Sequence, residues 1–220
     1  MFFNKKNKIF CLSTQRTGTT SVGAFFKHFG YNVADWSISS KNKWSLDWDN
    51  GNFEAIFNSK EFKDNQVFED DPWWLPEFYK VLFHRFPGSK FILLTRDSEA
   101  WFNSMLSHSK GKTLGNTKRH CKVYRREQDF YNLFNNDRDV LNYDDKKIDN
   151  LLPLEGYRDH YINLYELRNK EIVDFFNRNS PESLFHVRLE DEEKWDKLGE
   201  FMKIDIPQGF TMHANKSVKK

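Results

Sequence analysis

The chain has few cysteines, and no apolar run approaches the length of a membrane span. Its two cysteines, Cys11 and Cys121, form no Cys-x-x-Cys pair, which argues against a disulfide scaffold or a zinc site. Two unpaired thiols suit a reducing compartment. The first residues lead directly into an apolar segment and leave no room for a signal peptide. We therefore expect a cytoplasmic protein with no membrane-spanning segment.

An excess of charge of one sign is also missing. The 34 basic and 32 acidic residues leave a formal net charge of +2. No nucleic-acid-binding motif accompanies them, so we expect no nucleic-acid partner. No group of His, Cys, Asp or Glu residues has the spacing of metal ligands, so we expect no metal. Nothing in the sequence indicates an oligomeric state.

What is present is an alternation of apolar runs and helical patterns. Apolar runs lie at 8–14, 66–69, 90–95 and 184–189, a short candidate strand at 31–34, and helical patterns at 18–29, 75–86, 98–107 and 157–178. This alternation predicts an α/β protein of three layers, with helices on both faces of a central parallel sheet. With 22 phenylalanines in 220 residues, we expect a single domain, 1–220, with a Phe-rich core.

Two stretches, 36–65 and 108–156, fit this alternation badly. Both are long for plain connections, and we interpret them as irregular walls of an acceptor site. Part of the second stretch, 108–126, holds no acidic residue and several basic ones: Lys110, Lys112, Lys118, Arg119, Lys122, Arg125 and Arg126. It is either a lid or landing site for an anionic ligand, or a solvated helix face. The sequence does not decide between these two.

The most informative segment predicts a phosphate-binding turn. An apolar strand, 9–12, leads into a turn at Gly18 and then into a helix with an apolar side. Backbone N–H groups that open a helix bind anions, with help from the helix dipole. The turn adds hydroxyls and one fixed positive charge, from Thr17, Thr19, Thr20, Ser21 and Arg16. An ordinary strand–turn–helix corner is the alternative.

The nucleotide triphosphatase form of such a turn needs a second glycine followed by Lys. Here Gly18 is followed by Thr19, and position 13 is Ser. This argues against a kinase-type P-loop.

A second segment places an arginine at the end of another apolar strand. The strand, 91–94, is followed by Arg96, and a helix that begins near Ser98 carries Ser104. Ligands of open α/β sheets bind at the carboxyl ends of strands, where an arginine can hold a phosphate through its fork of donors. Singly, Arg96 would fit a surface ion pair and Ser104 a solvated helix position.

These motifs resemble those of the sulfotransferase family. Gln15-Arg-Thr-Gly-Thr-Thr-Ser21 is similar to its 5'-phosphosulfate loop, usually Pro-Lys/Arg-Ser/Thr-Gly-Thr-Thr, with Gln15 in place of Pro. Arg96 and Ser104 keep the spacing of the family's 3'-phosphate grip. Further similarity lies in the segments 68–76, 86–96, 184–191 and 206–207, and in the tail around His213, Asn215 and Lys216. The resemblance is scattered along nearly the whole chain.

The resemblance implies a P-loop NTPase-like sulfotransferase fold and 3'-phosphoadenosine 5'-phosphosulfate as donor, with 3',5'-bisphosphoadenosine as product. It implies that the donor is held by Gln15, Arg16, Thr17, Gly18, Thr19, Thr20, Ser21, Arg96, Ser104 and Lys216. Arg16 stands at the family's catalytic Lys/Arg position. Because Arg is a poor proton donor, we assign it electrostatic stabilisation of the transferring group.

An attacking hydroxyl needs a general base. Asp70 occupies the place of a His that many sulfotransferases carry two residues before a Pro, and Asp71 follows it. Paired carboxylates at a strand end can raise each other's pKa. Asp71 before Pro72 is equally typical of a helix N-cap. His160, in a helical pattern, is a weaker candidate for the base, and Trp73 and Trp74 would line the acceptor site or belong to the core.

The function that we predict is sulfuryl transfer to a hydroxyl or amine. The alternatives are a P-loop kinase of nucleotides or small molecules, and a non-catalytic module that binds a nucleotide or an anionic glycan. The acceptor is not readable from the sequence: a small molecule, a lipid and a saccharide all fit.

Overall fold

The computed structural model describes residues 7–115, 117–133, 152–212 and 214. The chain divides into two compact units, residues 1–96 with 172–220, and residues 97–171.

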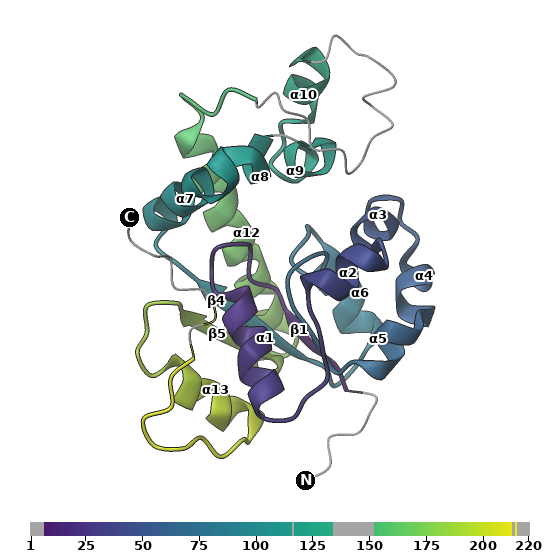
Figure 1. Ribbon diagram of the computed structural model, residues 1–220, viewed down its shortest axis with the longest axis vertical. Coiled ribbons are helices and arrows are strands. Elements are labelled where there is room, and N and C mark those ends of the chain that lie inside the picture. Colours follow the sequence, from purple (N-terminus) through teal and green to yellow (C-terminus); the bar gives the residue numbers. More distant parts are fainter. Residues whose placement is uncertain (1–6, 116, 134–151, 213, 215–220) are drawn as a thin grey trace. The chain divides into compact units, whose positions relative to one another are not determined.

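The first unit contains a five-stranded parallel sheet. Its strands are β1 (Ile9–Cys11), β2 (Val33–Ala34), β3 (Val67–Phe68), β4 (Lys90–Thr95) and β5 (Leu184–Arg188). Their order across the sheet is β2-β3-β1-β4-β5, and every pairing is parallel. The neighbouring strands β1, β4 and β5 can be followed in Figure 1. The strands therefore lie where the apolar runs predicted them.

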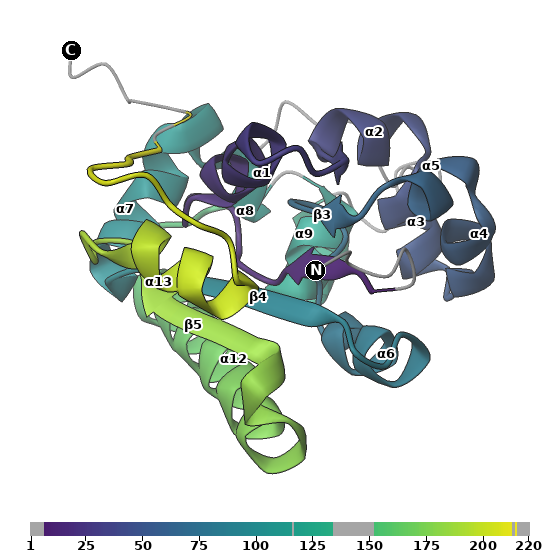
Figure 2. The ribbon, with the colours of Figure 1, turned by 90° about the horizontal axis from the view of Figure 1, so that it is seen from below.

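Alternate residues of the strands face two separate hydrophobic cores. In β1, Ile9 and Cys11 pack in one core with Phe25 of helix α1 (Thr19–His28) and Trp195 of helix α13 (Lys194–Met202). Phe10 belongs to the other core. That core also takes side chains from α3 (Trp44–Asp49), α4 (Phe53–Asn58), α5 (Lys60–Asp64), α6 (Phe78–Arg85) and the last turns of α12 (Arg158–Asn179). Helices thus cover both faces of the sheet (Figure 2), which confirms the three-layer α/β/α prediction.

The stretch 36–65 is mostly helical rather than irregular. It forms four short helices, α2 (Trp36–Lys41), α3, α4 and α5. Asp35 and Ser59 cap α2 and α5 through side-chain hydrogen bonds. Trp44 is buried in the core, whereas Trp36 at the start of α2 is 58% exposed.

The second unit is helical. It contains α7 (Ser98–Ser107), a 3-10 turn (His108–Gly111), α8 (Lys112–Gly115), α9 (Lys118–Val123), α10 (Glu127–Leu133) and the first turns of α12. Asp97 caps α7, since its carboxylate accepts a hydrogen bond from the amide of Ala100 at 2.9 Å. Trp101 of α7 stacks on Tyr165 of α12 with ring centroids 4.3 Å apart, in the core of this unit.

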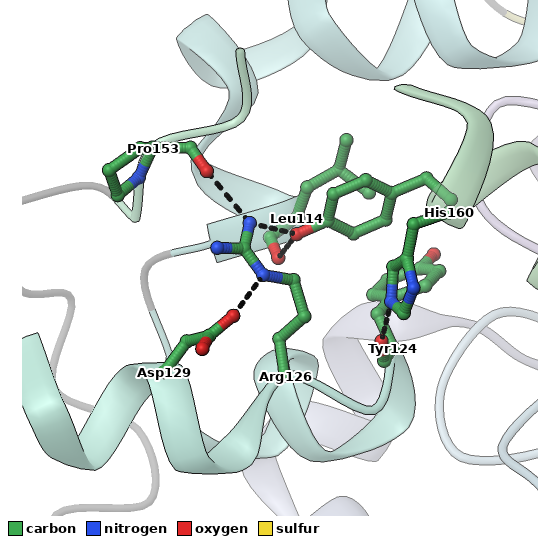
Figure 3. Close-up of polar contacts among 7 residues, drawn as sticks. Leu114, Tyr124, Arg126, Asp129, Pro153 and His160 are labelled. Carbon is green, nitrogen blue, oxygen red and sulfur yellow. Dashed lines mark hydrogen bonds and ion pairs between the residues drawn. The ribbon is translucent and has the colours of Figure 1, made fainter. Parts of the chain in front are cut away.

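The basic stretch 108–126 is not a uniform surface feature. Lys122 and Arg125 are exposed, but Arg126 is 4% exposed. Its guanidinium donates to Asp129 at 2.7 Å, to the carbonyl of Pro153 at 2.8 Å and to the hydroxyl of Tyr161 at 3.3 Å (Figure 3). Arg126 therefore holds the fold of this unit together.

Candidate active site

Two of the predicted anion-binding segments begin at adjacent strand ends. β1 and β4 are paired in parallel, with Cys11 opposite Ile92, so their carboxyl ends lie at the same edge of the sheet. From β1 the chain passes toward β2 on one side, and β5 lies on the other side of β4. Connections that diverge in this way open a crevice where α/β proteins bind ligands.

The loop after β1 is tied directly to β4. The amide of Leu12 donates to the carbonyl of Ile92 at 2.7 Å, and the amide of Leu94 donates to the hydroxyl of Ser13 at 2.7 Å. Within the loop, the hydroxyl of Thr17 donates to the carbonyl of Thr14 at 2.5 Å, so that hydroxyl serves the loop itself. The result is a loop with a fixed shape.

Two residues of this loop have left-handed backbone conformations. Arg16 has φ 66° and Gly18 has φ 93°. A Cβ atom at Gly18 would lie 2.7 Å from Cδ1 of Leu189 and 3.5 Å from Cδ1 of Leu94. Glycine is therefore required here both by the backbone conformation and by the close packing against the ends of β4 and β5.

The first turn of α1 offers a site for an anion. Gly18 is its N-cap, provides no side-chain cap, and no acidic residue lies in the first turn. Such a helix start carries partial positive charge on its backbone N–H groups. Of the hydroxyls in this turn, that of Ser21 accepts a hydrogen bond from the amide of Ala214 at 3.2 Å, while Thr20 is exposed.

Arg96 follows β4 and is paired with an acidic side chain. Its Nε lies 3.6 Å from Oε1 of Glu190, which comes just after β5. Arg188 also approaches Glu190, at 3.7 Å. The ion pair that the sequence allowed for Arg96 is thus present, at the same sheet edge as the loop after β1. A phosphate could replace Glu190 as its partner, because both are oxyanions that accept from a guanidinium.

The third component is a run of three acidic residues after β3, the other neighbour of β1. Asp71 is buried, and its Oδ1 accepts hydrogen bonds from Nε1 of Trp74 and, at 3.5 Å, from Nε2 of Gln15. The contact with Gln15 joins this run to the loop after β1. The prediction that Asp71 caps a helix is wrong, because residues 71–77 form turns and α6 begins only at Phe78.

The surroundings of these carboxyl groups disfavour their charged forms. Burial, the charge of Asp71 and that of Glu69 raise the pKa of Asp70 to about 8. Burial and the charge of Asp35 raise the pKa of Glu69 to about 7. These groups therefore exchange protons near neutral pH, which is the range that a general base needs.

Glu69 was not predicted as a site residue from the sequence. It is 3% exposed and lies against the first turns of α1, where a Cβ at Gly23 would come within 3.0 Å of its Cγ. The signal was its place at the head of the acidic run directly after an apolar strand.

The other candidates are placed as follows. Trp73 belongs to the core and Trp74 is fully buried, so neither is an exposed acceptor wall. His160, in the second unit, has Nε2 2.8 Å from the carbonyl oxygen of Tyr124 (Figure 3). Ser104 lies in α7 of the second unit, and its role stays a prediction. The tail residues His213, Asn215 and Lys216 lie outside the described residues.

A comparison with known families accounts for the chain as a whole. A family model described as a sulfotransferase domain matches residues 8–219. The chain belongs to the sulfotransferase family. The match spans both compact units, and it confirms the resemblance carried by the motifs after β1 and β4. No curated protein sequence matches the chain at a significant level.

Two further observations bear on this sulfotransferase. Among the helices of residues 7–214 that are described, none is both long and apolar enough to cross a membrane. Within the same residues, no group of three or more His, Cys, Asp or Glu side chains is arranged to hold a metal ion.

Proposed function

We propose that this protein transfers a sulfuryl group from 3'-phosphoadenosine 5'-phosphosulfate to a hydroxyl or amine of a small molecule, lipid or saccharide. The observation that carries the proposal is the juxtaposition of the loop after β1 with Arg96 after β4, at adjacent strand ends. The donor carries a 3'-phosphate and a 5'-phosphosulfate on one ribose, so it needs two anion-binding sites within the length of a nucleotide. Family membership supports sulfuryl transfer in general.

The 5'-phosphosulfate would bind at the start of α1. The glycine turn at Gly18, the uncapped N-terminus and the cation of Arg16 all suit an anion there. Arg96 would hold the 3'-phosphate through the fork of donors of its guanidinium.

Sulfuryl transfer resembles phosphoryl transfer in what it asks of a protein, which is mainly positioning and charge stabilisation. Arg16 would stabilise negative charge on the bridging oxygen as the bond to sulfur breaks. A guanidinium is a poor proton acceptor, so the proton of the attacking hydroxyl must go elsewhere.

Asp70 is the group that we assign to take this proton. Its raised pKa, about 8, makes its conjugate base stronger than an ordinary aspartate at the same pH. Asp71 is held by Trp74 and Gln15 and is better suited to keep the loop and the acidic run in place.

A cytoplasmic location remains our expectation. It is supported by the two cysteines, Cys11 and Cys121, which are both buried and unpaired.

Calorimetry and activity measurements together test the proposal. The purified protein should bind 3',5'-bisphosphoadenosine and should prefer it to ATP with magnesium. It should also move labelled sulfate from the donor to at least one member of a broad panel of phenols, sterols, amines and saccharides. Preferential binding of ATP would instead favour a kinase, and donor binding with neither transfer nor slow donor hydrolysis would favour a non-catalytic module.

A further inference from the structure

The carboxylate of Glu69 lies beneath the turn to which the proposed function assigns the donor's 5' group. Its Cγ would be 3.0 Å, and its Oε1 3.4 Å, from a Cβ placed on Gly23 of α1. Gly23 is four residues after Thr19, so both lie on the same face of that helix. The hydroxyl of Thr19, itself buried, is the hydrogen-bond partner of Glu69.

The charge of Glu69 is poorly compensated. Its Oε2 is buried and has no hydrogen-bond partner among the residues that the structure describes. The charged or titratable groups that act on it are Asp35 from the end of β2, which raises its pKa, and Lys27 from α1, which lowers it. The neighbouring Asp70 and the buried thiol of Cys11 also interact with it. Lys27 is itself paired with Asp35 at 2.9 Å, so little of its charge is left for Glu69.

The direction of the hydrogen bond between Thr19 and Glu69 depends on whether the carboxyl group of Glu69 is protonated. An ionised carboxylate can only accept hydrogen bonds. When Glu69 is ionised, the Thr19 hydroxyl must therefore donate its single hydrogen to Glu69. A protonated Glu69 can donate instead, and the Thr19 hydrogen becomes available at the start of α1. An anion bound there would also repel an ionised Glu69.

We propose that Glu69 is a positioning residue that takes up a proton from solvent when the donor's 5' group binds, and so turns the Thr19 hydroxyl toward that group. This inference rests on the proposed function, because it takes the start of α1 as the 5' site. In this step one proton passes from the buffer to a carboxylate oxygen of Glu69. No covalent bond of the donor forms or breaks.

The experiment is calorimetric titration of the full-length protein with 3',5'-bisphosphoadenosine in buffers of different ionisation enthalpy at pH 7.5. At this pH the ligand's phosphates are almost fully ionised, since their second pKa is about 6, so most of any proton uptake belongs to the protein. A group with a pKa of about 7 is mostly ionised at pH 7.5, so complete protonation on binding would take up about 0.8 proton. Wild-type affinity should accordingly fall as the pH rises above 7, by at most about tenfold per pH unit through this group.

Glu69→Gln keeps the shape and imitates the protonated form. This variant should lose most of the proton uptake, and its affinity for 3',5'-bisphosphoadenosine should depend less on pH. Above pH 8 it should bind this ligand more tightly than wild type does. Asp70→Asn is the matched control, because it removes the adjacent carboxylate and should retain uptake. Thr19→Ser should behave as wild type, and Thr19→Val should lose affinity at every pH.

The outcomes separate the two proposals. Binding by wild type without proton uptake, or uptake that survives Glu69→Gln and disappears in Asp70→Asn, overturns the role of Glu69 and leaves the sulfotransferase proposal standing. Failure of wild type to bind the bisphosphate at all overturns both. Thermal unfolding of each variant shows whether it is folded, and the wild-type uptake measurement needs no variant.

Discussion

The amide of Leu94 donates a hydrogen bond to the hydroxyl of Ser13, and this contact links the strand that precedes Arg96 to the loop that contains Arg16. Both partners are buried. The contact fixes the start of one anion-binding segment against the strand that carries the other.

Arg16→Ala should lower kcat by about 100-fold to 1,000-fold, because it removes the positive charge assigned to the bridging oxygen. Arg16→Lys should retain much of the activity, since the family's motif accepts either residue at this place. Steady-state kinetics with labelled donor would measure both variants. Full turnover by Arg16→Ala would contradict the electrostatic role.

Arg96→Ala should weaken binding of 3',5'-bisphosphoadenosine by about 10-fold to 100-fold, which is the range for loss of a hydrogen bond between charged groups. Arg188→Ala is a matched control, because Arg188 approaches the same carboxylate of Glu190 but extends from β5. Calorimetry should show a change only for Arg96. Equal losses in the two variants would indicate that the ion pair, rather than a phosphate contact, explains the effect.

The pH dependence of turnover should report Asp70. Its pKa is raised to about 8, so the basic form is depleted below that pH, and kcat at saturating donor should fall by up to about tenfold per unit as the pH drops from 8 to 6. Asp70→Asn should abolish this dependence along with most of the activity. A kcat that stays constant over this range in wild type would exclude Asp70 as the base.

Gly18→Ala should impair the phosphate-binding turn. The left-handed conformation costs a residue with a Cβ about 1–2 kcal/mol, and the new methyl would press on Leu189 at 2.7 Å. Gly30→Ala is the control, because Gly30 has a similar φ of 80° and no neighbour within 4 Å of the added Cβ. Chemical denaturation should show a loss of stability for both, while affinity for the bisphosphate should fall only for Gly18→Ala.

Arg126→Met should destabilise the second unit by about 2 kcal/mol, because it removes charge-assisted hydrogen bonds to Asp129, Pro153 and Tyr161. Arg125→Met changes an exposed neighbour and should have little effect. Urea denaturation followed by tryptophan fluorescence would compare the two, since Trp101 lies in the core of that unit.

The sequence predicted strands β1 to β4 well because nearly all of their residues are buried, whereas β5 is partly exposed. Continuous apolar runs such as 90–95 then stand out against the amphipathic helices around them. The stretch 36–65 was harder to interpret because its helices are five or six residues long, too short for a periodic pattern to develop.

The site was only partly predictable for a different reason. Gly18 and Arg16 were predictable because they lie in a turn between an apolar strand and a helical pattern. Arg96 was predictable because it follows an apolar strand directly. The role of Asp71 depends on Gln15, 56 residues away, and on Trp74. The pKa of Glu69 depends on burial under α1, which no local pattern contains.

Helix α12 has a consequence for how the chain can be divided. Its first turns supply Tyr161 and Tyr165 to the core of one unit, and its last turns supply Ile172 and Phe176 to the other. A proline introduced near Glu171 would therefore damage two cores at once. Expressing either unit alone would interrupt this continuous helix. An isolated fragment of either unit should therefore keep the whole of α12.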